Sequence, residues 1–300
     1  AVTGGLLVIT ALLAVLALAF GRGEMLLLFD LTQTLPVLFK IDDMGMVFAV
    51  VAVLVFVCAG FFSFEYMKHE AHERRYYGFY LIVFGILMAL CFAGNLVTFY
   101  LFFEILTLSS MTLVLHSGSK EAVMAGLKYL FYSLCGAYMV LFGFYFLSHY
   151  ANTLSFSEGS VLNPDLTAGH TGLLCAAAFA MILGFSVKAG MFPMHAWLTA
   201  AHPAAPAPAS AVLSAVIVKA GVLGIIRVVY YLFGASFLRD GWVQRVWMVT
   251  RASTIHTLHT LHTLCSAPPS CGMAGCRGCG WCLPLSPYSW DRSWPTGSPC

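Results

Sequence analysis

The sequence predicts an all-α membrane protein with about seven to eight transmembrane helices, one of them discontinuous. Of its 300 residues, 60% are hydrophobic and only 9% are charged, whereas a soluble domain carries about 25% charged residues. Apolar stretches near the ~20 residues that cross the hydrocarbon core recur along the chain. They lack the alternation of a membrane β-barrel. The net charge of +2 supplies no basic surface for nucleic acid.

Seven apolar segments are expected to span the membrane. They cover residues 4–20, 44–64, 76–93, 95–115, 122–147, 172–189 and 207–233. The first has no charged leader and no clear cleavage site, so we interpret it as a span rather than a signal peptide. All seven are predicted to be helices, because a helix satisfies its own backbone hydrogen bonds in lipid. We therefore divide the chain into a helical membrane domain, 1–250, and a tail, 251–300.

Basic residues between the predicted spans indicate the orientation. Three lie in the loop 65–77, and Lys120 lies in the loop 116–120. By the positive-inside rule both loops face the cytoplasm, and the loop 150–170, which has no Lys or Arg, faces the other side. The chain is therefore expected to be a multi-pass protein of the inner (plasma) membrane.

The tail differs in character from the rest of the chain. It has no membrane span, and thiolates at CxxC spacing with nearby histidines can bind zinc or iron. The candidate ligands are Cys276, Cys279, Cys282, His256, His259 and His262. The alternative is that the tail is translated in the wrong reading frame. Codons that encode residues 286–300 can be chosen so that a reading frame shifted by two bases encodes TIFMGSFLAYRESL. That peptide is a plausible membrane span. We favour the shifted frame, which leaves the tail disordered or non-native and without a metal.

Ionisable residues lie deep inside three predicted spans. Glu104 and Lys219 are near the middle of the fourth and seventh segments, and Lys188 is near the end of the sixth. A charge at the centre of a span costs about 2.5–3.5 kcal/mol and usually marks an ion pathway. We predict such a pathway, although Glu104 and Lys188 could instead form a structural ion pair between two helices.

A proline-rich segment between the sixth and seventh spans predicts the discontinuous helix. Pro193 removes a backbone hydrogen bond, and interrupted helices often mark ion sites in transporters. Removal from water disfavours a charged lysine and a nearby carboxylate favours it, so a changing Glu104–Lys188 distance would load or release a proton. Neutral histidines could pass it on. The predicted proton relay comprises Glu104, Lys188, Lys219, His202, His195 and Lys128.

Three basic residues allow other interpretations. Lys128 lies two turns into the fifth span, so it could snorkel to the membrane surface instead of joining the relay. Arg227 and Arg239 are expected at the membrane interface.

Three segments carry a family resemblance. They are FFEILTLSS (102–110), GLKYLFYSLCGA (126–137) and SVKAGMFPMHAWLTAAHPAAPAPASAVLSAVIVKAGVLGIIR (186–227). They resemble the antiporter-like proton-translocating subunits of respiratory complex I, Mrp-type cation/proton antiporters and membrane-bound energy-converting hydrogenases, over roughly residues 4–250.

The resemblance implies roles for individual residues. Glu104 matches the family's intramembrane glutamate, and Lys188 matches the broken-helix lysine that pairs with it. Lys219 matches the central lysine of the next helix. The histidines His195 and His202 match those of the broken helix, and Lys128 matches a lysine in the helix after the glutamate.

The resemblance also implies the setting of the chain. Family members contain two inverted helix repeats, and this chain corresponds to roughly the first half of such a subunit. We expect a non-redox subunit of a redox-driven pump, which is similar to NADH:quinone oxidoreductase or a hydrogenase and binds no cofactor itself. Its partners would be other membrane subunits, the lipid bilayer, and protons or sodium ions, but no nucleic acid. One alternative is a subunit of an Mrp-type antiporter, and another is a metal-binding membrane protein that uses the tail.

Overall fold

The computed structural model describes most of the predicted membrane domain. The described residues are 2–21, 23, 25–32, 35–70, 72–157, 159–167 and 170–239. The chain divides into two units, residues 1–256 and 257–300, and everything below concerns the first. The candidate metal ligands Cys276, Cys279 and Cys282, like the rest of the tail, lie outside the described residues.

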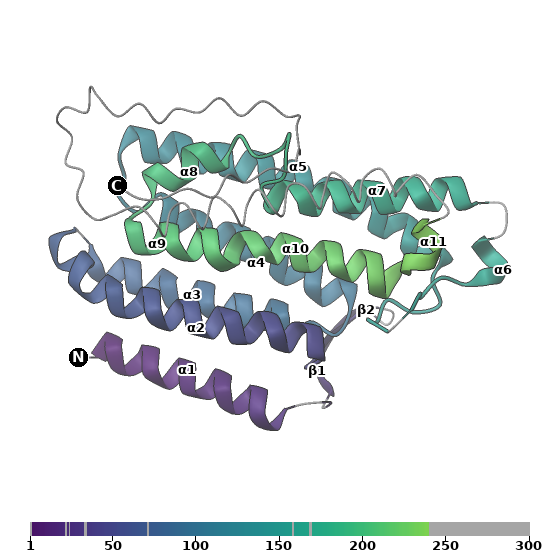
Figure 1. The fold of residues 1–300 in the computed structure, drawn as a ribbon, viewed down its shortest axis with the longest axis horizontal. Coiled ribbons are helices and arrows are strands. Elements are labelled where there is room, and N and C mark those ends of the chain that lie inside the picture. The colour runs from purple at the N-terminus through teal and green to yellow at the C-terminus, as the bar shows by residue number, and fades with distance from the viewer. Residues whose placement is uncertain are drawn as a thin grey trace, which may run out of the picture. The chain divides into compact units, whose positions relative to one another are not determined.

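The prediction of a helical membrane protein is confirmed, although the described part of the chain also contains one β-hairpin (Figure 1). Six helical runs in the described part are long and apolar enough to cross a membrane. They are Asp43–His69, Glu73–Cys91, Leu96–Val114, Lys120–Tyr150, Thr171–Lys188 and Ala207–Leu232. A seventh helix, α1 (Val2–Phe20), contains the shorter apolar stretch Gly4–Ala17. These seven correspond in order to the seven predicted segments.

Several runs are built from more than one helical piece. The long helices are α2 (Asp43–Tyr66), α3 (Glu73–Cys91), α4 (Leu96–Val114), α5 (Lys120–Tyr150) and α7 (Thr171–Lys188). A 3-10 turn, η1 (Met67–His69), extends α2. The last run joins α9 (Ala207–Val212), the π-helix η2 (Leu213–Ile217), α10 (Val218–Ile226) and the π-helix η3 (Arg227–Leu232). Short helices are α6 (Pro164–Thr167), α8 (Leu198–Ala204) and α11 (Ala235–Arg239).

Side-chain caps fix where three of the spans begin. The carboxylate of Asp42 accepts a hydrogen bond from the backbone N–H of Gly45 at 3.0 Å, at the start of α2. Asn95 caps α4 and Ser119 caps α5 in the same way. Each cap satisfies a backbone donor that the first turn of a helix leaves unpaired. The predicted spans that start at these three caps accordingly begin within two residues of the observed helices.

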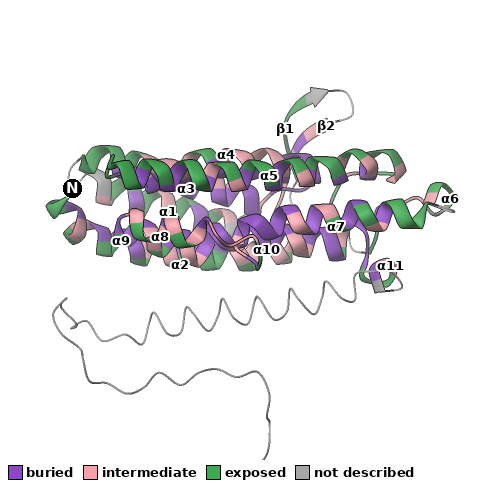
Figure 2. Cartoon of the chain, turned by 90° about the horizontal axis from the view of Figure 1, so that it is seen from above, coloured by how far each residue is buried: buried purple, intermediate pink, exposed green. Residues whose placement is uncertain are grey.

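A β-hairpin between the first two spans was not predicted. Strand β1 (Met25–Thr32) pairs antiparallel with β2 (Leu35–Lys40). The turn between α3 and α4 holds β2 in place, because the N–H of Lys40 donates to the carbonyl of Phe92 at 2.8 Å and the N–H of Gly94 donates to that of Leu38 at 2.9 Å. The hairpin projects beside the helices in Figure 2.

Small residues let α7 pack closely between two neighbouring helices. A Cβ atom on Gly136 of α5 would lie 2.7 Å from the carbonyl oxygen of Gly184 on α7. A Cβ atom on Gly221 of α10 would lie 2.6 Å from the carbonyl oxygen of Phe185 on α7. Small residues commonly permit this close approach of backbones in membrane helices. The carboxyl end of α7, which carries Lys188, is therefore enclosed by protein.

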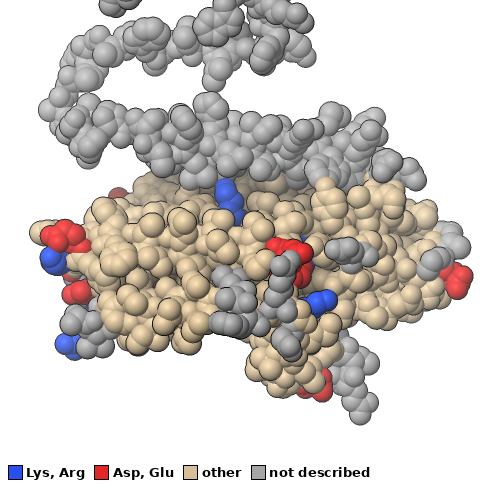
Figure 3. Space-filling view, turned by 60° about the horizontal axis from the view of Figure 1, so that its bottom comes forward, with Lys and Arg blue, Asp and Glu red and all other residues tan. Residues whose placement is uncertain are grey.

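Large apolar side chains cover much of the outer surface. Examples are Leu54, Phe131 and Tyr145, which are 62%, 66% and 70% exposed. The described residues visible in Figure 3 are mostly tan, with charged side chains in a few separate patches. A soluble monomer rarely exposes contiguous apolar surface on this scale, so these faces are suited to contact lipid or other membrane subunits.

Candidate functional site

The break in the sixth span is produced by a glycine cap. Helix α7 ends at Lys188, and Gly190 adopts a left-handed conformation with φ 66°. The N–H of Gly190 donates to the carbonyl of Val187, and the N–H of Met191 donates to that of Ser186. This pair of bonds is a Schellman motif, in which glycine tolerates the positive φ. The predicted break is present, but it begins at Gly190 and not at Pro193.

A buried tryptophan holds the non-helical segment against α7. The indole N–H of Trp197 donates to the carbonyl oxygen of Val187 at 2.8 Å. Val187 lies in the last turn of α7, where carbonyl groups have no partner within the helix. The Trp197 ring also packs on Tyr129 of α5, with ring centroids 4.7 Å apart. Helix α8 then follows, and Pro206 occupies the residue position directly before α9.

Lys188 is enclosed and is held by hydroxyl groups. It is 1% exposed, and its ammonium donates to Thr107 Oγ1 at 2.9 Å and to the hydroxyl of Tyr129. The ammonium also lies 4.7 Å from the centre of the Tyr129 ring. The Tyr129 hydroxyl is in turn 2.7 Å from Ser110 Oγ. A buried charge requires such partners, since an isolated one is very costly.

Glu104 lies one turn before Thr107 on α4, but it does not form an ion pair with Lys188. In the part of the chain that is described, the buried Oε1 atom of Glu104 has no hydrogen-bond partner. Lys188 is nevertheless bonded to Thr107, which lies three residues after Glu104 on the same helix. The structure therefore does not show the alternative, a direct ion pair between Glu104 and Lys188. The Lys188 ammonium is bonded to the hydroxyl groups of Thr107 and Tyr129 instead of the Glu104 carboxylate.

Of the two histidines in the predicted relay, His195 lies in the helix break and His202 lies after it. His202 Nδ1 is 2.8 Å from Ser210 Oγ, which links α8 to α9. His195 lies in the non-helical segment beside Phe192, with ring centroids 5.8 Å apart. Its Nδ1 atom is buried and has no partner among the described residues. Neither histidine is hydrogen-bonded to Lys188 within the described part of the chain.

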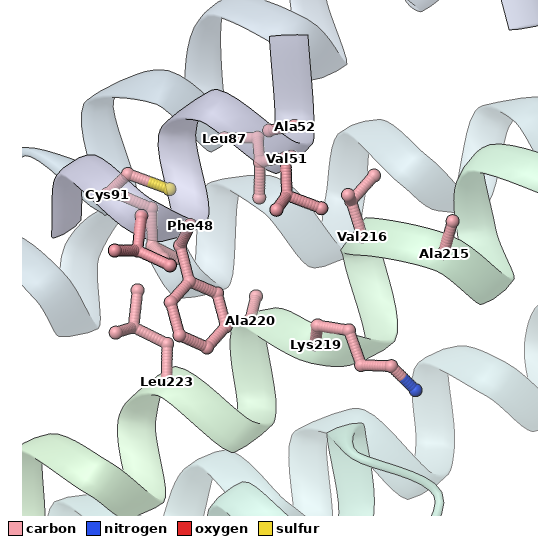
Figure 4. Close-up of a pocket in the computed structure, with 12 residues that line it drawn as sticks. Phe48, Val51, Ala52, Leu87, Cys91, Ala215, Val216, Lys219, Ala220 and Leu223 are labelled. Atoms are coloured by element: carbon pink, nitrogen blue, oxygen red, sulfur yellow. The ribbon is translucent and has the colours of Figure 1, made fainter. Parts of the chain in front are cut away.

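Lys219 lies on α10, between the two π-helical segments. Its aliphatic stem lines an apolar cavity of about 150 Å³ together with residues of α2 and α3, such as Phe48 and Cys91. Figure 4 shows the ammonium pointing away from the other labelled side chains. Lys219 makes no hydrogen bond to another described residue. It thus presents its charge away from the cavity, whose walls are mostly apolar.

Lys128 is exposed on the outer side of α5. It lines an open groove against α8 and does not join the hydroxyl cluster around Lys188. Of its two interpretations, this exposure favours the snorkelling lysine over a relay member.

Arg227 was predicted at the membrane interface, and in the structure it lies inside the protein beside Asp42, the residue that caps α2. The residue is 1% exposed and forms a two-pronged ion pair with Asp42, with one N–O distance of 2.7 Å. Its guanidinium lies 4.6 Å from the centre of the Phe156 ring and 4.8 Å from that of Tyr231. Arg227, like Lys219, falls inside the predicted seventh span. Its position in the sequence therefore already indicated a charge buried in the protein.

The hydroxyl cluster of Thr107, Ser110 and Tyr129 was also missed, although all three lie in the segments that carried the family resemblance. No group of three or more His, Cys, Asp or Glu side chains among the described residues could hold a metal ion.

Two family descriptions match the chain. "NADH:quinone oxidoreductase/Mrp antiporter, TM" matches residues 93–262, and "NADH-Ubiquinone oxidoreductase (complex I), chain 5 N-terminus" matches residues 31–77. Hydrogenase-4 component B of Escherichia coli is 34% identical over 64% of this chain and 28% of its own length. A Na(+)/H(+) antiporter subunit of Bacillus subtilis is 28% identical over 64% of this chain and 38% of its own length. The chain thus spans well under half of these relatives.

Solved structures share the fold. A chain of the membrane-bound sulfane sulfur reductase, an archaeal respiratory membrane complex, superimposes with a TM-score of 0.63 at 21% identity over 75% of this chain and 46% of its own length. A chain of the Mrp complex from Dietzia superimposes with a TM-score of 0.62 at 20% identity, over 82% and 45%. With a family match over more than half its length, the chain belongs to the antiporter-like transmembrane family of NADH:quinone oxidoreductases, hydrogenases and Mrp antiporters.

Proposed function

We propose that the chain forms the first half-channel of a proton-translocating subunit in a redox-driven pump, a complex I-like or hydrogenase assembly of the plasma membrane. The observation that carries the proposal is the setting of Lys188. This lysine is buried at a helix break and is held by the hydroxyl groups of Thr107 and Tyr129, and within the described residues a carboxylate oxygen without a partner lies on Glu104, one turn from Thr107. Buried ionisable residues in membrane spans are functional by default.

The hydroxyl cluster suits either protonation state of Lys188. A hydroxyl can accept a hydrogen bond from an ammonium, and it can donate one to a neutral amine. Movement of Lys188 toward Glu104 would favour the charged form, because an opposite charge stabilises it. Movement of Lys188 back to Thr107 and Tyr129 would remove the stabilising interaction with the Glu104 carboxylate. The lysine would then release its proton. The pair therefore has the elements of a switch between loading and release.

The break supplies the onward path in this proposal. Non-helical backbone at membrane depth persists where it is buried in protein or lines a wet cavity. His202, which follows the break and is bonded to Ser210 of α9, could take the proton from the Lys188 region. Lys219 on the next helix, and His195 inside the break, would be later or parallel sites. Lys128 lies on the outer face of α5, so it could exchange protons with the relay only from that face.

An Mrp-type cation/proton exchanger is the second candidate, and the name of the Bacillus subtilis relative favours it. It would use the same residues but no electron donor. Sodium-dependent proton flux in vesicles without an electron donor would support the exchanger, whereas flux that requires the donor would support the redox pump.

The relay is tested by alanine substitution in the assembled complex that contains this chain. Glu104→Ala and Lys188→Ala are each expected to abolish coupled proton uptake by inverted membrane vesicles while the complex still assembles. The matched controls are Glu65→Ala and Lys68→Ala, which remove an exposed acid and base that pair on the surface. We expect these controls to keep the full rate. If Lys219→Ala also kept the full rate, the proposed proton path from Lys188 to Lys219 would be wrong.

A further inference from the structure

An open groove lies between the first turns of α5 and the short helix α8. Its volume is about 690 Å³, within the ~300–1,000 Å³ range of sites that hold small molecules. Helix α5 contributes Glu121, Met124, Lys128 and Phe131, and α8 contributes Thr199 and Pro203. Met124 and Phe131 are each 66% exposed. The groove is therefore an outward-facing surface with two charges on an apolar wall.

The two charges stand at different depths along α5. The helix has 31 residues, which at ~1.5 Å per residue is roughly 16 Å longer than the ~30 Å hydrocarbon core. Because the predicted span begins at residue 122, we take the first turns of α5 to stand at the level of the lipid headgroups. Glu121 is in the first turn, Lys128 lies about 10 Å deeper at the same rise per residue, and Phe131 lies deeper still. Spacings of three, four and seven residues place these side chains on one stripe of the helix.

Neither charge is paired within the part of the chain that the structure covers. In the described part of the chain, Glu121 and Lys128 make no ion pair and no hydrogen bond. A lysine at this depth, beside exposed apolar side chains, is stabilised by an anion at the headgroup level. The carboxylate above it is stabilised by a cation. The groove thus presents a negative group outermost, a positive group below it and apolar surface toward the membrane centre.

We propose that this groove binds a zwitterionic phospholipid with an ethanolamine headgroup. Read from the water inward, such a lipid offers an ammonium, then a phosphate, then acyl chains, which is the complement of Glu121, Lys128 and Phe131 in that order. A lipid with a net negative headgroup could place its phosphate on Lys128, but it would leave Glu121 without a cation. The charge order therefore selects the zwitterionic lipid.

The test measures lipids that stay bound to the purified 300-residue chain. The chain in detergent is offered equal amounts of phosphatidylethanolamine and phosphatidylglycerol, and the adducts are counted by native mass spectrometry. Wild type is expected to retain phosphatidylethanolamine preferentially. Lys128→Gln is expected to lower its occupancy about tenfold or more, since a hydrogen bond to a charged group contributes about 1.5–3 kcal/mol. Glu121→Gln is expected to erase the preference between the two lipids.

Lys120→Gln is the matched control, because Lys120 is exposed on the same helix end and does not line the groove. It is expected to bind like wild type. Unchanged binding in Lys128→Gln, or a wild-type preference for phosphatidylglycerol, would overturn the proposal. So would capture of another subunit, in place of lipid, by a photoreactive residue at position 131 in the assembled complex. Proton transport is not measured here, so the outcome is independent of the proposed relay.

Discussion

At the scale of single residues, Tyr129 decides how Lys188 is held. The tyrosine is fully buried, and its hydroxyl contacts both the Lys188 ammonium and Ser110. Its ring lies beneath the same ammonium, so packing and hydrogen bonding are combined in one side chain. The hydroxyl and the ring can be separated by mutation, because phenylalanine keeps only the ring.

Tyr129→Phe is therefore expected to lower coupled proton uptake by about tenfold or more in complex that still assembles. The loss of one hydrogen bond to a charged group corresponds to about 1.5–3 kcal/mol. Lys188 would then have less support away from Glu104 and would release its proton less readily. Proton uptake by inverted vesicles measures the effect. Tyr132→Phe, on the same helix, is the control and should have no effect; an unchanged rate in Tyr129→Phe would argue against the hydroxyl as a partner in the relay.

The residues of the site differ in how far the sequence could predict them. Glu104, Lys188 and Lys219 were predictable because a charge inside an apolar span is costly and therefore conspicuous. Thr107 and Tyr129 were not, since hydroxyl side chains are common in membrane helices and only the packing of α4, α5 and α7 brings these two together.

At the scale of elements, the cap at Gly190 sets the position of the helix break. Its left-handed backbone turns the chain away directly after Lys188, so the lysine ends α7 and points into the bundle. A side chain at residue 190 would meet only Leu198 at ordinary van der Waals distance, 3.4 Å or more. Any cost of substitution therefore arises from the backbone conformation and not from a clash.

Gly190→Ala is expected to destabilise the protein by about 1–2 kcal/mol, the cost of a left-handed conformation for an L-residue. Thermal unfolding in detergent, followed by circular dichroism, measures the change. Gly172→Ala is the control, because Gly172 lies at the start of α7 and an added methyl group there would have no neighbouring atom within 4 Å. That variant should unfold at or above the wild-type temperature. Equal temperatures for both variants would show that the cap does not hold the break.

The elements themselves were predictable to different degrees. Long apolar helices were found because about 20 consecutive apolar residues have few other interpretations. The hairpin β1–β2 was missed, since short apolar runs do not distinguish strands from other buried segments. The π-helical segments η2 and η3 left no signal, because one extra residue in a turn does not change the composition of a span.

At the scale of the whole described unit, loops on the two sides of the bundle fasten the helices together. On one side, Asn95 donates from Nδ2 to the carbonyl of Pro36 at 2.6 Å, and the N–H of Val161 donates to that of Leu232 at 3.0 Å. On the other, Arg75 donates to the carbonyl of His116 at 2.5 Å. This contact agrees with the prediction that the loops 65–77 and 116–120 share one side.

The ion pair between Asp42 and Arg227 is the contact that ties the start of α2 to the end of the last span, and its two halves are unequally exposed. Arg227 is 1% exposed at the side chain and Asp42 is 22% exposed. An unpaired charge costs more where water cannot reach it. Loss of the carboxylate should therefore harm the fold more than loss of the guanidinium.

Asp42→Asn and Arg227→Met test this asymmetry with little change in shape. Asparagine remains a good helix cap, so Asp42→Asn removes the charge and keeps the start of α2. It leaves Arg227 buried and unpaired, and it should destabilise the protein by about 3–5 kcal/mol. Arg227→Met leaves the carboxylate near water and should cost less. The double variant buries neither charge, so it should be more stable than Asp42→Asn alone in thermal unfolding in detergent. If the two losses simply added, the residues would contribute independently and the pair would not tie the two spans.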